Sequence, residues 1–259
     1  NNTGIGYNAL VSNTTATGNT AVGKDSLKEN VDGGNNTAVG LCSLRNNSTG
    51  GNNTAIGFRA GEDTTGGQNT ALGSCALFDN SSGDNNTAIG KEALANNTTA
   101  DNNVAVGNLA LLANTTGDQN VAVGSGALGA NTTGCRNIGI GYNSLTVNTT
   151  GCCNVSVGRA SLDANIDGDF NTAVGTNSLS GNTTANNNTA IGYLTMNANT
   201  TGTENVAVGS GALDSNTTAG CNTSIGHGSM GDNTEGASNV AVGRSALGSN
   251  TTGASNVAI

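Results

Sequence analysis

Three kinds of side chain in this sequence could do chemistry: six cysteines, three regularly spaced aspartates and a single histidine. Cys135 and Cys152 are separated by 17 residues, and the same step joins Asp84 to Asp101 and Asp101 to Asp118. The histidine has no second histidine with which to bind a metal, and no serine or cysteine accompanies it at a fixed spacing as a nucleophile would. The 17-residue step is therefore the feature that could bring reactive groups together.

The same step organises the whole chain as a repeat. NTAVG begins at Asn19 and Asn36, NTAIG at Asn53 and NTALG at Asn69. The unit reads N-T-A-V-G-x-x-A-L-x-x-N-T-T-G-x-x, and positions 1 to 17 are counted here from the leading asparagine. The unit at Asn53 has 16 residues and carries Gly61 where most units have leucine. The leading asparagines are residues 2, 19, 36, 53, 69, 86, 103, 120, 137, 154, 171, 188, 205, 222, 239 and 256.

A 17-residue unit of this kind predicts one coil of an all-β parallel β-solenoid. It is too short for a helix-turn-helix repeat, and its fixed positions lack helical spacing. Positions 1 to 4 should form a strand in which positions 2 and 4 share a face, with position 4 and the leucine at position 9 buried. We expect a second short strand at positions 8 and 9, and corners at the glycine of position 5 and at N-T-T-G. Residues 1–259 should form a single continuous repeat domain, a segment of a longer fibre protein.

Stacked coils would place equivalent positions about 4.8 Å apart. Asp84, Asp101 and Asp118 share position 16, so their carboxylates could form a column that attracts Ca²⁺ or only counterions, which makes them a weak cation candidate. Cys135 and Cys152 share the same position, and the spacing lies within the Cα separation of about 4.4 to 6.8 Å that a disulfide needs. This pair is a disulfide candidate, although parallel side chains in register can aim badly. The pattern predicts no catalytic residue, no cofactor and no dedicated metal site.

The asparagines at positions 1 and 12 have two interpretations. In register, their amides would form ladders in which each side chain donates a hydrogen bond to the next. Many also lie in N-x-[ST] sequons, so N-glycosylation is the alternative. Glycans on every coil would be crowded at about 4.8 Å, which favours the ladders. The candidate N-glycosylation sites are Asn13, Asn97, Asn114, Asn131, Asn148, Asn182, Asn199, Asn216 and Asn250.

Composition excludes several classes of function. The chain has 41 glycines, no proline, no tryptophan and only 10% charged residues, which is unlike the composition of a compact enzyme. A net charge of -9 with only eight lysines and arginines argues against a nucleic-acid partner, because phosphate neutralisation dominates such binding. No apolar run approaches the roughly 20 residues of a membrane helix, so no membrane insertion of this segment is expected.

The string NTAIG-x-x-AL-x-x-NTTG, repeated over residues 2–259, resembles the head repeats of trimeric autotransporter adhesins. It is still more similar to NTA[IV]G-x-x-AL-x-x-NTTG arrays in fibre-like proteins of phages, large DNA viruses and microbes. The adhesin resemblance implies a left-handed β-roll, three associated chains and attachment to surface glycans or matrix. It therefore implies a non-catalytic structural or adhesive fibre that assembles with identical chains, as a trimer or filament, outside a cell or on a virion.

An energy argument also favours a homo-oligomer. The few apolar side chains of one coil offset only part of the entropy lost on ordering 17 residues, and positions 1, 3 and 5 should form a flat face that another chain can approach. One alternative is a monomeric solenoid that binds ice or another surface, which would require a regular T-x-T pattern. Position 2 instead alternates threonine with valine or isoleucine. A second alternative is the shaft of a fibre that carries an enzymatic domain elsewhere.

Overall fold

The computed structural model describes residues 1–259, and all of its regular secondary structure is β-strand. The chain divides into two compact units, Asn1–Thr133 and Gly134–Ile259. The strands of the first unit are β1 (Thr3–Ile5), β2 (Thr20–Val22), β3 (Thr37–Val39), β4 (Thr54–Ile56), β5 (Thr70–Leu72), β6 (Thr87–Ile89), β7 (Val104–Val106) and β8 (Val121–Val123). Those of the second are β9 (Ile138–Ile140), β10 (Val155–Val157), β11 (Thr172–Val174), β12 (Thr189–Ile191), β13 (Val206–Val208), β14 (Thr223–Ile225), β15 (Val240–Val242) and β16 (Val257–Ala258).

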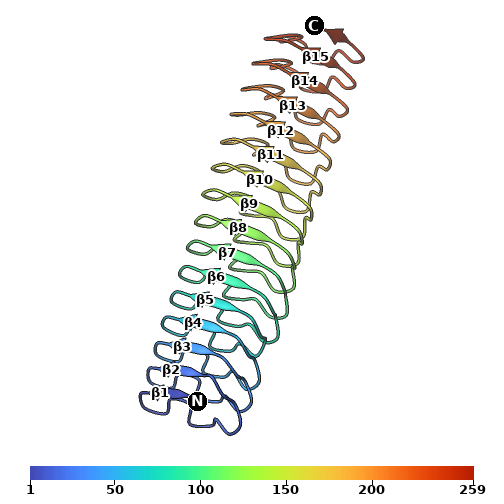
Figure 1. Ribbon diagram of the computed structural model, residues 1–259. Helices are drawn as coiled ribbons and strands as arrows, with labels where there is room; N and C mark the ends of the chain where they lie inside the picture. The colour runs from blue at the N-terminus through green and yellow to red at the C-terminus, as the bar shows by residue number, and fades with distance from the viewer. The chain divides into compact units, whose positions relative to one another are not determined.

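Each unit is a stack of coils in which successive strands pair in parallel and in sequence order (Figure 1). Each residue pairs with its equivalent one repeat later, as Thr20 does with Thr37 in the first unit and Val155 with Thr172 in the second. Around the short repeat, Thr54 pairs with Thr70, so the missing residue does not shift the register of the strands. The prediction of a parallel β-solenoid with one repeat per coil is confirmed.

The chain leaves each strand through a glycine that no other residue can replace without strain. Gly158, at position 5, has φ +144°, and a Cβ built on it would lie 2.4 Å from the carbonyl oxygen of Gly175 in the next coil. Successive coils therefore approach one another closely at this corner, which explains the glycine on steric as well as conformational grounds.

The expected second strand at positions 8 and 9 was wrong, because this segment is a pair of turns. The amide of Ser144 donates to the Gly141 carbonyl at 3.3 Å, and the amide of Asn148 donates to the Leu145 carbonyl at 3.4 Å. Leu145, at position 9, has φ +54°, a left-handed conformation that costs a residue with a Cβ about 1 to 2 kcal/mol. Its side chain is fully buried, and burial of a leucine is worth a comparable amount.

The strands bury the opposite face from the one that the sequence suggested. Alanine at position 3 is buried in nearly every coil, whereas positions 2 and 4 are half-buried or exposed. A Cβ built on Gly4, at position 3, would lie 3.6 Å from Cδ1 of Leu10, at position 9 of the same coil. The space between strand and leucine therefore admits a methyl group and little more, which is why alanine points inward and valine or isoleucine points outward.

The short repeat departs from the others at one corner. Thr64 takes the place of the position-12 asparagine, because its backbone N–H donates to the Gly61 carbonyl as the backbone N–H of Asn47 does to the Leu44 carbonyl. The Oδ1 atom of Asn47, in the preceding coil, is buried and has no hydrogen-bond partner. The short repeat also buries the carboxylate of Glu62, which pairs with Arg59 in the same repeat and with Arg45 of the preceding one at 3.5 Å. The deletion thus leaves the strands in register and interrupts a side-chain ladder.

Candidate functional site

The asparagines at position 12 form a ladder inside the coils. The amide nitrogen of Asn97 donates to Oδ1 of Asn80 at 2.7 Å and to the carbonyl of Ala100 at 3.0 Å. Its own Oδ1 accepts from Nδ2 of Asn114 at 3.0 Å. The same arrangement recurs in the second unit, where Asn182 donates to Asn165 at 2.8 Å. The predicted asparagine ladder is confirmed.

The asparagines at position 1 form a second ladder of a different kind. Oδ1 of Asn154 accepts the backbone N–H of Asn171 at 2.9 Å, and Nδ2 of Asn171 donates to the Ala185 carbonyl at 2.8 Å. Each of these side chains therefore links two coils and also fastens the start of a strand to the corner at the end of the same repeat. Both ladders stabilise the scaffold, and neither presents a polar group to a ligand.

The candidate glycosylation sites lie in the position-12 ladder. Their side-chain nitrogens donate hydrogen bonds within the coil and to the neighbouring coil, as the nitrogen of Asn199 does to Oδ1 of Asn182 at 3.1 Å. A glycan would have to replace these hydrogen bonds and move the amide out of the interior. N-glycosylation stays a prediction. Asn97, Asn114, Asn131, Asn148, Asn182, Asn199 and Asn216 are buried, while Asn13 and Asn250 at the outer coils are half-buried.

The three aspartates do form a column, and each carboxylate accepts a hydrogen bond from a backbone N–H of the preceding coil. Oδ1 of Asp84 accepts the N–H of Gly67 at 2.7 Å, Oδ1 of Asp101 accepts the N–H of Asp84 at 2.7 Å, and Oδ1 of Asp118 accepts the N–H of Asp101 at 2.8 Å. No group of three or more His, Cys, Asp or Glu side chains is arranged to hold a metal ion. One oxygen of each carboxylate is therefore committed to the scaffold.

The candidate disulfide cysteines lie at the same position 16, in the second unit. Both are free thiols and half-buried, and their Sγ atoms are 2.9 Å apart. Cys42, Cys75 and Cys221 are also free, and each lies on a different coil. The 17-residue spacing therefore brings together only the pair Cys135 and Cys152 at the distance of a direct sulfur contact.

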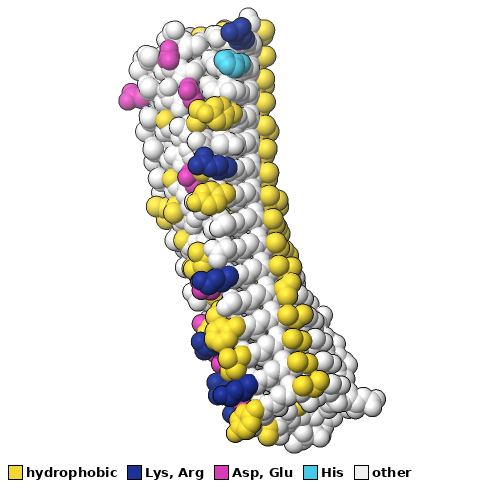
Figure 2. Space-filling model, turned by 90° about the vertical axis from the view of Figure 1, so that its left-hand side faces the viewer, with side chains coloured by type: hydrophobic (Ala, Val, Ile, Leu, Met, Phe, Trp, Pro, Cys, Tyr) yellow, Lys and Arg dark blue, Asp and Glu magenta, His cyan; other side chains and the backbone are white.

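The outer side of the strands is a continuous surface in each unit. We call it the strand face and define it as repeat positions 2 and 4 of β1–β8 and, separately, of β9–β16. It contains only Thr, Val, Ile and Leu. Figure 2 shows hydrophobic side chains aligned in a column along the coils. Exposed members at position 4 are Ile5, Ile56, Leu72 and Val123 in the first unit, and Ile140, Ile191, Ile225 and Val242 in the second.

Sequence reasoning missed this face because it placed valine and isoleucine inside the coil. The signal that could have found it is the near-invariance of alanine at position 3, since the smallest side chain marks the most crowded side of a strand.

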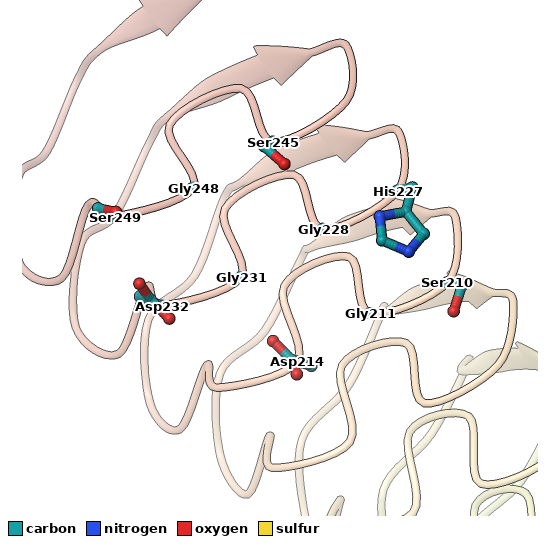
Figure 3. A pocket seen from close by; sticks show the side chains of 10 residues that line it. All are labelled: Ser210, Gly211, Asp214, His227, Gly228, Gly231, Asp232, Ser245, Gly248 and Ser249. Atoms are coloured by element: carbon teal, nitrogen blue, oxygen red, sulfur yellow. The ribbon is translucent and has the colours of Figure 1, made fainter.

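A shallow depression of about 450 Å³ lies in the second unit, over positions 6, 7, 10 and 11 of three successive coils (Figure 3). It exists because four of its lining residues are glycines, and Asp214, Asp232 and His227 extend beside it. Burial, reinforced by the nearby Asp232, raises the pKa of Asp214. Its polar groups do not converge on one point, and no nucleophile is paired with a base there.

No protein-family model matches the chain, and no curated protein matches it at a significant level. The structure contains no helix long and apolar enough to cross a membrane. The strand face is therefore the main candidate functional surface of the chain.

Proposed function

We propose that this chain is a non-catalytic structural shaft that associates with identical chains through its strand face. The observation that carries the proposal is the exposure of a charge-free strand face, apolar throughout position 4, on a chain whose net charge is -9. Every charged side chain lies outside positions 2 and 4, so two such faces can meet without burying a charge. Regular hydrogen-bonded ladders inside the coils support a scaffold role.

The size of the strand face favours association along many coils. Each strand presents about 10 Å of chain length, and coils repeat at about 4.8 Å, so eight coils offer a flat area of about 400 Å². This equals the largest apolar patches of typical monomers, and such patches often mark interaction sites. It is below the roughly 800 Å² per partner of a standard interface. The affinity between chains should therefore increase with the number of coils in contact, which is a functional reason for a long array of repeats.

The test removes apolar character from the strand face without touching the interior. Ile56 and Leu72 are adjacent across β4 and β5 and are 39% and 42% exposed, so both can be replaced by glutamate. The matched control is Leu41→Glu, because Leu41 is equally exposed at 42% but lies at position 6 in a corner. We expect the unaltered chain and the control to sediment as oligomers, and Ile56→Glu/Leu72→Glu as a folded monomer. A monomeric unaltered chain would refute association, and an equal effect of Leu41→Glu would refute the assignment of the surface.

The resemblance to adhesin head repeats supports finer proposals. We propose three chains as the assembled unit, a left-handed coil, a location outside a cell or on a virion surface, and attachment to surface glycans or matrix. Exposed aromatic side chains at the position-6 corner suit stacking on sugars. These are Tyr7, Phe58, Tyr142 and Tyr193. Binding of the folded chain to a glycan array, lost on replacing these aromatics by serine, tests the adhesive role.

A second candidate function, ice binding, is favoured by one specific observation. Six consecutive strands of the first unit, β1 to β6, carry an outward threonine at position 2. These threonines repeat at about 4.8 Å beside a column of isoleucine, valine and leucine, so the surface is flat and regular. Thermal hysteresis of the folded chain, reduced by Thr37→Lys, would support this function in place of self-association.

A further inference from the structure

The side chains at position 16 have a common structural role, and Cys152 shares it. In this column, the side chain of one coil accepts a hydrogen bond from the backbone N–H of the preceding coil. Asp169 does this for Cys152 at 2.7 Å, as Asp101 does for Asp84 at 2.7 Å. Sγ of Cys152 takes the same place, because it accepts the N–H of Cys135 at 3.0 Å. The column therefore fixes where the sulfur of Cys152 lies.

The same geometry brings the two sulfurs into contact. Sγ of Cys135 lies 2.9 Å from Sγ of Cys152, so a bond of about 2.05 Å requires a movement of only about 1 Å. The hydrogen bond to Cys152, together with burial, raises the pKa of the Cys135 thiol to about 11. The backbone N–H of Cys135 also donates to the sulfur of Cys152, and the raised pKa keeps the thiol of Cys135 protonated. Cys152 is therefore placed as the attacking sulfur and Cys135 as the resolving one.

We propose that Cys135 and Cys152 are an oxidation site that forms an intrachain disulfide, which covalently joins two adjacent coils of the second unit. The oxidant is a low-molecular-weight disulfide such as oxidised glutathione. The thiolate of Cys152 attacks one sulfur of the oxidant and releases the first small thiol. Cys135 then loses its proton, attacks the Cys152 sulfur and releases the second small thiol. In balance, two protein thiols and one small disulfide become one protein disulfide and two small thiols.

The neighbouring Cys153 is the main competitor for Cys152. It follows Cys152 directly in the chain, and its backbone N–H donates to the carbonyl of Cys135 at 3.0 Å. The structure records a sulfur contact for Cys152 only with Cys135. Cys42 and Cys75 share position 7 but lie two coils apart, about 10 Å in this geometry, which is outside the range for an intrachain bond.

The sequence permits an unambiguous assay of the pairing. Trypsin cuts after Lys91, Arg136 and Arg159, so Cys135 lies alone in the peptide 92–136, whereas Cys152 and Cys153 share the peptide 137–159. The reduced full chain is equilibrated in glutathione buffers of graded redox ratio, alkylated in acid and digested. We expect the two peptides to be joined in protein that runs as a single chain without reductant. Cys42 forms only a mixed disulfide with glutathione and serves as the reference. The bond between Cys135 and Cys152 should persist at a ratio of reduced to oxidised glutathione at least about tenfold higher than the ratio that reduces this mixed disulfide.

Two variants separate the pairings. Cys153→Ser should leave the peptides joined, and Cys152→Ser should abolish the link. A closed ring within the peptide 137–159, a link between separate chains, or mixed disulfides with glutathione at both sulfurs would each overturn the proposal. A link that survives Cys152→Ser would show that Cys153 is the partner and would also overturn it. The expected outcome does not depend on self-association, because the linked peptides are read from a single chain.

Discussion

Replacing Asn97 by alanine should test whether the position-12 ladder holds the coils together. The substitution removes a side chain that is fully buried and makes hydrogen bonds to Asn80, Ala100 and Asn114. The Ala100 carbonyl keeps a donor, because Nδ2 of Asn86 also binds it at 2.8 Å. Oδ1 of Asn80 and one amide hydrogen of Asn114 lose their partners. Each buried group left unpaired costs about 1 to 3 kcal/mol, so we expect the free energy of unfolding to fall by about 2 to 6 kcal/mol.

The measurement is equilibrium unfolding in urea followed by circular dichroism, with an unchanged dependence on denaturant as the condition for comparison. The matched control is Asn108→Ala in the next coil, where the side chain is exposed and makes only a 3.5 Å contact. It should change stability by less than about 0.5 kcal/mol. Asn97→Asp keeps the shape and removes the donors, so it excludes a cavity as the cause. Its destabilisation should lessen in acid, where the carboxyl gains a proton to donate. If Asn97→Ala costs no more than the control, the ladder does not carry the stability assigned to it.

Four further substitutions test the corners, one partly buried carboxylate and the interrupted ladder. Gly158→Ala should cost at least about 3 kcal/mol of unfolding free energy, because its Cβ would meet backbone in the next coil, whereas Gly211→Ala, with nothing within 4 Å of its Cβ, should cost only about 1 kcal/mol. Burial raises the pKa of Asp163 in the folded state, so Asp163→Asn should stabilise the protein at pH 7. This gain should vanish as the pH falls through the raised pKa towards the unfolded value of about 3.9. A pH-independent effect would contradict the stated cause. Thr64→Asn should supply the missing donor to Oδ1 of Asn47 and raise the unfolding free energy by about 1 kcal/mol, and a loss of stability would show that the shortened corner cannot accept the amide.

The repeat allowed the stacked coils to be predicted, but the side chains that point into the coil could not be predicted in the same way. The period of 17 residues and the recurring asparagines predict one coil per repeat and ladders between coils, and Thr20 pairing with Thr37 and Asn97 binding Asn80 confirm both. The inward face could not be read from hydrophobicity, because a three-residue strand has one inward side chain and Ala38 takes it. The left-handed leucines, such as Leu145, were equally hidden, since residues with a Cβ seldom adopt that conformation.

The columns that vary are where this scaffold can acquire a function. Each coil contacts its neighbours through fixed positions, so its stability is set mainly by the interfaces that it shares with them. Alanine, leucine, glycine and the two asparagines form these interfaces, which leaves positions 6, 7, 10, 11, 16 and 17 open to change. A change at one of these positions is placed beside its equivalent, about 4.8 Å away, in the adjacent coil. Two cysteines 17 residues apart thereby become a sulfur contact, and three aspartates become a column on the backbone. Substitutions at the same position of two neighbouring repeats therefore suffice to bring two reactive side chains together on this scaffold.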